Sequence, residues 1–337
     1  MPLVIPRFTV CATWASVTDA VDVLLRYPYV ALDTEGQSIG TIGGALSLLC
    51  LGTPVPGPSQ QIFVMDMVAL RTVPGALKTL RSFLELPFIV KIVFDGRMDS
   101  VELFHTLEVS LTNVLDLQVA EVLARRTIRG ESDRQRHERL ARGGFGFRVV
   151  RVYRTSLEGL HMVSGMQRLL EDLGMDNIVQ KDTEVVAMHR ANRGDLWMIR
   201  PLPQKLLQYA ANDICIIAYL FETFRRIGYV PSATNDLMDL IGKCDQYVSR
   251  NGHVGLRTAR DNEFRPKGLL MEAALERPRG VTYDCAGCGL DFPIACYQVQ
   301  IARSARLRKS HCRLCDAIVL KSREEIAPEP SWVPFFL

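Results

Sequence analysis

Two carboxylates lie one residue apart in the stretch ALDTEG, where an apolar, β-branched run ends. Asp33 and Glu35 project from the same face of a strand, because strand side chains alternate with a period of two. Carboxylates this close oppose each other's ionisation unless cations lie between them. From this stretch alone two interpretations stay open, a strand end that has reached solvent and a site that holds metal ions.

A tyrosine and a third carboxylate stand in the apolar, helix-periodic stretch LLQYAANDICIIAYL. Tyr209 and Asp213 are four residues apart and are therefore neighbours on one helix face. Apolar residues surround Asp213, and a buried carboxylate without a partner is unstable by several kcal/mol. Its partner could be a metal, a cage of hydrogen bonds or Arg200 in the preceding turn.

The elements that carry these residues indicate an α/β domain. Strands are expected at the short apolar, β-branched runs 29–34, 46–53, 61–68, 89–95 and 114–118, and helices at 16–26, 74–85, 99–108, 164–174 and 203–226. Ser16 is the expected cap of the first helix. Asp99 lies near the start of a later helix, where it either ligates a metal or interacts with the helix dipole. The order of the elements predicts a mixed sheet with a hairpin-connected half and a parallel half.

Taken together, these motifs resemble the DEDD family of 3'-5' exonucleases, and the tyrosine marks its DEDDy, ribonuclease D-like branch. The segments VLDLQVAEVLA and DLWMIRPLPQKLLQYAANDI are similar to further segments of that branch. DTEG, GGALSLLCLG and FDGRMDS most resemble fungal proteins with a 3'-5' exonuclease domain. The resemblance covers about residues 15–226. It implies a ribonuclease H-like fold with a mixed five-stranded sheet flanked by helices.

The resemblance also implies roles for five residues. The metal-binding acids are Asp33, Glu35, Asp99 and Asp213, and Tyr209 positions the attacking water. Hard oxygen ligands suit two Mg²⁺ or Mn²⁺ ions, which can activate water and neutralise a leaving oxygen. The implied activity is hydrolysis of single-stranded nucleic acid from its 3' end, with RNA favoured over DNA. The alternative is a catalytically silent nuclease fold that acts as an RNA-binding adaptor.

Near the C-terminus, two CxxC pairs are separated by 23 residues. Cys285, Cys288, Cys312 and Cys315 match the spacing of a four-cysteine structural zinc site in a zinc ribbon. A redox CxxC would not come as a matched pair. We therefore expect one structural Zn²⁺ that folds the module and does no chemistry, with Cys296 and His311 as spare ligands.

Basic residues gather in two places. Ten arginines and three acids occupy 125–154, which we interpret as a flexible basic insertion with a short helix. A second cluster lies beside the cysteines and could grip phosphates or simply form a solvated basic face: Arg303, Arg306, Arg308 and Lys309.

The bulk composition is that of a soluble globular protein, with 337 residues, 48% hydrophobic, 23% charged and a net charge of +3. The N-terminal sequence lacks a secretory pattern, no run of eighteen apolar residues occurs, and nine cysteines suit a reducing compartment. We expect an intracellular protein of the cytoplasm or nucleus without membrane contact. The expected domains are an exonuclease domain at 1–230, a helical linker at 231–275, the zinc ribbon at 276–320 and an extended tail at 321–337, which could bind a protein partner.

Overall fold

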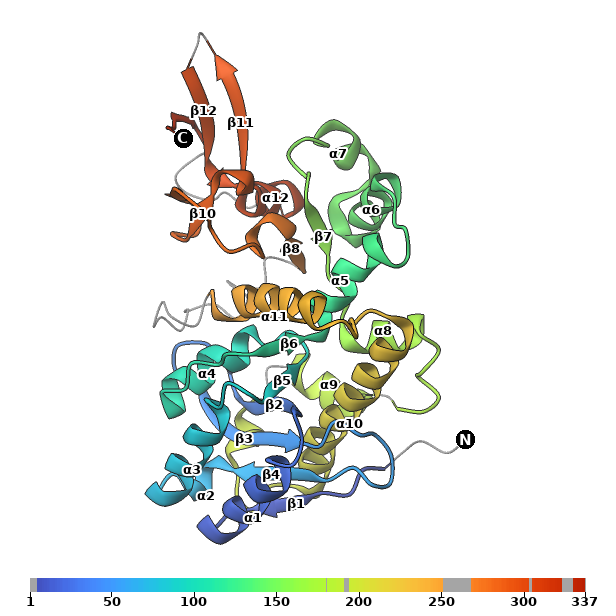
Figure 1. Ribbon diagram of the computed structural model, residues 1–337, viewed down its shortest axis with the longest axis vertical. Helices are drawn as coiled ribbons and strands as arrows, with labels where there is room; N and C mark the ends of the chain where they lie inside the picture. Colours follow the sequence, from blue (N-terminus) through green and yellow to red (C-terminus); the bar gives the residue numbers. More distant parts are fainter. Residues whose placement is uncertain are drawn as a thin grey trace. The chain divides into compact units, whose positions relative to one another are not determined.

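The computed structural model describes residues 5–179, 181–190, 194–250, 268–302, 305–322 and 330–336 (Figure 1). The chain forms two compact units. Unit 1 comprises residues 1–121 and 164–261, and unit 2 comprises residues 122–163 and 262–337. Within the described ranges, no helix is both long and apolar enough to cross a membrane.

Unit 1 is built on a mixed sheet of six strands in the order β1-β4-β3-β2-β5-β6. β2 pairs antiparallel with β3 and β3 with β4, whereas the pairs β1–β4, β2–β5 and β5–β6 are parallel. The strands are β1 (Thr9–Cys11), β2 (Tyr29–Gln37), β3 (Ala45–Gly52), β4 (Ile62–Asp66), β5 (Val90–Val93) and β6 (Val114–Asp116).

The prediction of a mixed sheet flanked by helices is confirmed, but the sheet has six strands and not five. The additional strand, β1, pairs through Thr9, Val10 and Cys11 with Phe63, Val64 and Met65 of β4. Three residues at an edge give no periodic signal of their own, because their pairing depends on the neighbouring strand.

The helices of unit 1 pack around this sheet. They are α1 (Trp14–Leu24), α2 (Met67–Leu70), α3 (Pro74–Leu84), α4 (Arg97–Leu107), α8 (Met166–Asp172), α9 (Thr183–Arg190), the 3₁₀ turn η2 (Gly194–Met198), α10 (Gln204–Ile227) and α11 (Thr234–Ser249), while α5 (Leu117–Thr127) runs from unit 1 into unit 2. The expected cap of α1 was wrong. Thr13 is the N-cap and forms a capping box with Ser16, which lies inside the helix.

Two glycines allow close approaches that shape the sheet near β2. A Cβ at Gly52 of β3 would lie 2.4 Å from Ile214 Cγ2, so glycine lets α10 pack directly on the sheet. A Cβ at Gly36 would lie 2.2 Å from the Ala45 carbonyl oxygen, where the β2–β3 register shifts after Glu35. A bulge of this kind redirects the strand immediately after its carboxylates.

Unit 2 combines short helices with small sheets. Its elements are α6 (Asp133–Leu140), the π-helical turn η1 (Ala141–Phe145), α7 (Phe147–Val152), β7 (Leu160–Met162), β8 (Leu269–Met271), η3 (Glu272–Ala274), β9 (Thr282–Asp284), β10 (Asp291–Pro293), η4 (Ile294–Cys296), β11 (Tyr297–Ala302), β12 (Ala305–Cys312), α12 (Arg313–Ser322) and β13 (Trp332–Pro334). The strands form the sheets β7–β8, β9–β10 and β11–β12–β13.

The predicted basic insertion and the predicted cysteine module share one hydrophobic core. Leu140, Phe145, Val150 and Leu160 pack in the same buried cluster as Phe292 and other residues of the cysteine module. Residues 125–154 therefore form helices with a buried face, whereas the sequence suggested a loose insertion. The reason is long-range, since the apolar residues that cover this segment come from more than a hundred residues later in the chain.

Candidate active site and thiol cluster

Three carboxylates from two elements converge in unit 1. Asp33 and Glu35 come from β2 and Asp213 comes from α10, and the ligand oxygens of the three lie within 4.8 Å of one another. Glu35 is 7% exposed and Asp213 is 3% exposed. Buried carboxylates at this separation form a set of hard oxygen ligands suited to a divalent cation.

Asp99, the fourth predicted acid, lies beside this group and outside the three-residue cluster. It stands in the first turn of α4, and its Oδ1 accepts hydrogen bonds from the Thr34 backbone N–H (3.0 Å) and hydroxyl (2.5 Å). Thr34 separates Asp33 from Glu35 on β2, so the start of α4 is tied to the strand between the two acids. This arrangement lets Asp99 assist the cluster from its edge.

The acids of the cluster carry like charges and oppose one another's ionisation. Burial raises the pKa of Asp33 well above its ordinary value, and Asp99 and Asp213 raise it further. Burial also raises the pKa of Glu35, with contributions from Asp33 and Asp213. Nearby positive charge is what would keep these groups ionised.

Lys181 supplies positive charge, and the sequence motifs did not identify it. Its Nζ lies 2.7 Å from Asp213 Oδ2 and donates to the Tyr209 hydroxyl at 3.1 Å. Burial alone would lower the pKa of Lys181, but Asp213 and Tyr209 raise it above its ordinary value. The other oxygen of Asp213, Oδ1, is buried without a hydrogen-bond partner among the described residues, which fits a place for a further cation.

Arg200, considered as a partner of Asp213, instead binds Asp66. Its Nε and Nη2 lie 2.8 Å from the two Asp66 oxygens, and Nη2 also donates to Ser47 Oγ at 3.0 Å. Trp197 accepts a hydrogen bond from Arg200 through its carbonyl and lies with its ring 6.2 Å from that of Tyr209. Arg200 therefore fixes this segment to Asp66 of β4, and the Trp197 ring packs next to Tyr209.

Tyr209 lies one helical turn before Asp213 on α10 and is 6% exposed. Burial raises the pKa of its hydroxyl, and Asp213 raises it further. The phenol is therefore protonated near neutral pH and is suited to orient a ligand by hydrogen bonding and not to act as a base.

A buried carboxylate holds the turn that starts α4. Asp116, at the end of β6, accepts hydrogen bonds from the backbone N–H groups of Asp95 (3.1 Å), Gly96 (3.0 Å) and Gln118 (2.9 Å). Burial, followed by the charge of Asp95, raises the pKa of Asp116 to about 7. Because Gly96 is the N-cap of α4, Asp116 contributes to the placement of Asp99.

The four cysteines of the CxxC pairs also converge. The Sγ atoms of Cys285, Cys288, Cys312 and Cys315 lie within 4.8 Å of one another, in unit 2. The backbone N–H of Cys312 donates to Cys285 Sγ at 3.1 Å. A Cβ at Gly287 would lie 2.5 Å from His311 Cδ2 and 3.0 Å from Cys315 Sγ, so the first pair requires glycine inside it. Four soft sulfur donors in one cluster fit a closed zinc site.

The predicted nucleic-acid contacts next to the cysteines differ in their surroundings. Arg303 lies outside the described residues, and Arg306 is exposed. The Arg308 guanidinium lies 4.9 Å from the Tyr283 ring centre and 4.7 Å from that of Tyr297. Lys309 Nζ lies 4.9 Å from the Trp332 ring centre. Arg308 and Lys309 thus already contact aromatic rings of their own unit.

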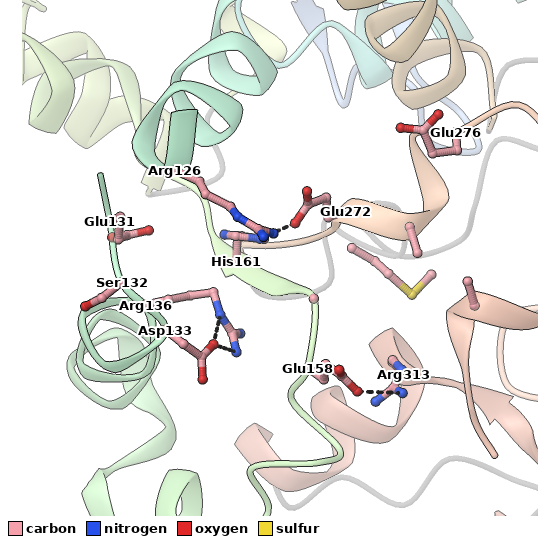
Figure 2. A pocket seen from close by; sticks show the side chains of 14 residues that line it. Arg126, Glu131, Ser132, Asp133, Arg136, Glu158, His161, Glu272, Glu276 and Arg313 are labelled. Carbon is pink, nitrogen blue, oxygen red and sulfur yellow. Dashed lines mark hydrogen bonds and ion pairs between the residues drawn. The ribbon is translucent and has the colours of Figure 1, made fainter. Parts of the chain in front are cut away.

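A cavity of about 810 Å³ lies within unit 2 (Figure 2). Ion pairs join Arg136 to Asp133 and Arg313 to Glu158 in its lining, and His161 Nε2 lies 3.1 Å from Glu272 Oε2. Its charged lining consists of three arginines, one histidine and five acids: Arg126, Arg136, Arg313, His161, Glu131, Asp133, Glu158, Glu272 and Glu276. This excess of acids opposes phosphate binding. A second cavity, of about 580 Å³, adjoins Lys181 and Tyr209 in unit 1 and is therefore next to the carboxylates.

Comparisons with known proteins give a consistent result. A family model described as 3'-5' exonuclease matches residues 9–228. The fold is similar to ribonuclease D of Trypanosoma brucei, with 25% identity, a TM-score of 0.58, and coverage of 86% of this chain and 87% of the other. A complex of that enzyme with RNA U12 gives 24% identity, a TM-score of 0.55, and coverage of 84% and 83%. No curated protein matched the chain. The resemblance to fungal proteins stays a prediction.

Proposed function

Because the chain belongs to the 3'-5' exonuclease family, as an enzyme of the DEDDy, ribonuclease D-like type, we propose that it removes nucleotides from the 3' end of single-stranded RNA. The preference for RNA over DNA is supported by the likeness to ribonuclease D of Trypanosoma brucei, which has been solved with RNA U12. The family shows the reaction class, and the substrate is the part that we propose.

One observation carries the proposal, the convergence within 4.8 Å of the half-buried Asp33 with the buried Glu35 and Asp213. The set contains only oxygen donors, and Asp213 Oδ1 has no hydrogen-bond partner in the described chain. Both features fit Mg²⁺ or Mn²⁺. When bound, a pair of such ions lowers the pKa of water and stabilises the charge on the leaving oxygen.

The chain's own residues hold and orient the reactants. Asp33, Glu35 and Asp213 would hold the ions, and Asp99 would support them from the edge of the cluster, where Thr34 fixes its Oδ1. The protonated Tyr209 hydroxyl would orient the attacking water. Lys181, 2.7 Å from Asp213, pairs with that carboxylate and holds the tyrosine hydroxyl in place.

The thiol cluster has a separate, structural role in this proposal. Cys285, Cys288, Cys312 and Cys315 would bind one Zn²⁺, and all four positions of a tetrahedral site would be filled by protein. Such a site stabilises unit 2 and leaves no position for a substrate. Since thiolate ligands must stay reduced, the site favours an intracellular location, in the cytoplasm or nucleus.

The test is hydrolysis of 3'-protected and unprotected single-stranded RNA and DNA, labelled at the 5' end, with Mg²⁺, Mn²⁺ or EDTA. We expect a ladder of one-nucleotide steps from free 3' ends, faster on RNA and absent in EDTA. Asp33→Asn should remove hydrolysis while the protein still binds RNA. Activity that survives in excess chelator would refute the proposal.

The alternative function, an RNA-binding adaptor without catalysis, makes a different prediction for the same assay. It requires RNA binding by the wild-type protein with no ladder under any metal condition. The presence of all four acids and Tyr209 favours the enzyme. A protein partner bound through the tail 321–337 stays a prediction.

A further inference from the structure

We propose that unit 2 carries a second binding surface for single-stranded RNA, on the outer side of α7 and the turn before it. This α7 surface consists of Phe147, Arg148 and Arg151 of the helix and Arg142 of the turn before it. It would bind the part of the strand that lies 5' to the nucleotide being removed. The inference rests on the proposed function, because it assigns a second contact to the same substrate.

The helix α7 has one buried and one exposed face. Val150 is 5% exposed and lies in the core of unit 2, with Val149 packed against the same core. Phe147, Arg148, Arg151 and Val152 are exposed and fall within an arc of about 140° on an ideal helix. The core therefore fixes the direction of the helix and presents these four side chains together to solvent.

The arginines of the α7 surface differ from those of the neighbouring helix. In α6, Arg134 pairs with Glu138 at 3.2 Å and Arg136 pairs with Asp133. Within the part of the chain that the structure describes, Arg142, Arg148 and Arg151 have no acidic partner and are exposed. Three such guanidinium groups on one short segment repel one another, and they are stabilised by the phosphates of a polyanion.

The same surface exposes an aromatic ring next to the charges. Phe147, on the same arc of α7 as Arg148 and Arg151, is 63% exposed. Exposed rings interleaved with arginines are the combination by which proteins bind single strands, since unpaired bases stack on the rings while the cations contact phosphates. An acidic protein would satisfy the arginines but would not account for the exposed Phe147 ring among them, and a duplex would keep its bases out of reach.

The basic residues of β12, among them Arg308 and Lys309, are weaker candidates for this role. Arg308 lies between two tyrosine rings and Lys309 lies over Trp332, so both cations are engaged within unit 2. Moving them onto phosphates would break ring contacts, and the α7 arginines make none with the described residues. This comparison favours α7 as the site of phosphate contact.

The first experiment measures equilibrium binding of a fluorescent single-stranded 20-mer RNA over a salt series, in an Asp33→Asn background that prevents hydrolysis. Each phosphate contact on a single strand contributes about 0.7 to the slope of log K against log salt. The triple variant Arg142→Gln, Arg148→Gln, Arg151→Gln should therefore lower that slope by about 2, and weaken binding up to about 100-fold at 0.1 M salt. The matched control changes three arginines that already have acidic partners, Arg81, Arg134 and Arg168, and should keep the slope.

A second pair of variants separates stacking from charge. Phe147→Ala should weaken RNA binding about 5- to 160-fold without changing the salt slope. Val152→Ala removes an apolar side chain of similar exposure, 61%, and should leave the affinity unchanged. Equal effects of the two substitutions would contradict a stacking role.

Hydrolysis in the active background then distinguishes this inference from the proposed function. A dinucleotide has one internucleotide phosphate, which lies in the active site during hydrolysis, so no phosphate is left to contact the α7 surface. The triple variant should therefore cleave the dinucleotide at the wild-type rate and show a raised KM only on long RNA. An unchanged slope and affinity for the 20-mer would overturn the α7 surface even if hydrolysis is normal. A wild-type protein that hydrolyses neither substrate would refute the proposed function, while the binding series would still decide the α7 surface.

Discussion

Substitution of Lys181 by methionine tests whether the protein's own cation stabilises the carboxylate cluster. Lys181 Nζ lies 2.7 Å from Asp213 Oδ2, and the two side chains are 23% and 4% exposed. Methionine keeps an unbranched side chain of similar length but removes the ammonium group. The substitution removes the Lys181 partner of Asp213 Oδ2. The other oxygen, Oδ1, is buried and already has no hydrogen-bond partner among the described residues.

The size of the effect follows from that burial. Removing one member of a buried ion pair typically costs about 3–5 kcal/mol, because the remaining charge stays desolvated. We expect the lower end, about 3 kcal/mol, since the Lys181 side chain is 23% exposed and the pair is therefore only partly desolvated. For a unit of this size such a loss corresponds to a fall in Tm of roughly 6–12 °C in EDTA. Mg²⁺ should reverse much of it, because a bound ion replaces the missing positive charge.

The assay is thermal unfolding of wild type and Lys181→Met in EDTA and across a Mg²⁺ series. The matched control is Lys205→Met. Lys205 is exposed, lines the same cavity of about 580 Å³ in unit 1 as Lys181, and pairs with Glu184 and Asp182. The control should unfold like wild type at every Mg²⁺ concentration. The reasoning is refuted if Lys181→Met is as stable as wild type in EDTA, or if Mg²⁺ stabilises both proteins equally.

Three further substitutions test other parts of the structure. Asp213→Asn should abolish hydrolysis without loss of RNA binding, as measured by the ladder assay and by fluorescence anisotropy, and retained activity would argue against its role. Cys312→Ser should lower bound zinc, measured by elemental analysis, from one per chain to none, whereas Cys296→Ser, a buried thiol outside the cluster, should retain it. Asp116, with a pKa raised to about 7, binds its proton more tightly in the folded than in the unfolded chain. Its contribution to stability is therefore largest below pH 4 and is lost between pH 4 and 7, by at most about 4 kcal/mol. Urea unfolding at several pH values should show this decline relative to Asp116→Asn, and a rise over the same range would show the opposite sign.

The parts of the site that could be predicted from sequence were those fixed by local periodicity. Asp33 and Glu35 share a face because strands alternate, and Tyr209 and Asp213 meet because four residues make one helical turn. That the two pairs meet depends on the packing of α10 against β2, which the family resemblance implied and no local pattern encodes. Lys181 follows no motif and stands just before α9, so its approach to Asp213 is a tertiary contact without a sequence signal.

The fold was predictable to a similar extent. The central strands were identified from their apolar, β-branched runs, but β1 is only three residues long and acquires its structure from β4. Residues 125–154 looked loose because arginine and glycine dominate their composition. Their buried residues, such as Leu140 and Val150, become a helix face only when Phe292 and the cysteine module cover them.

The shared core of unit 2 also has a consequence for biosynthesis. Residues up to 163 leave the ribosome long before Cys312 and Cys315, which close the unit. At a synthesis rate of roughly 5–20 residues per second, the apolar face of α6 and α7 stays uncovered for on the order of 10–30 s until the cysteine module has been made. During that interval the nascent chain can complete the sheet of unit 1 up to α10, while α6 and α7 stay open to chaperones or to aggregation. With the proposed Zn²⁺ as the ion that joins the two CxxC pairs, limited zinc would lengthen the vulnerable period, so the yield of folded protein should depend on zinc supply during translation and not only afterwards.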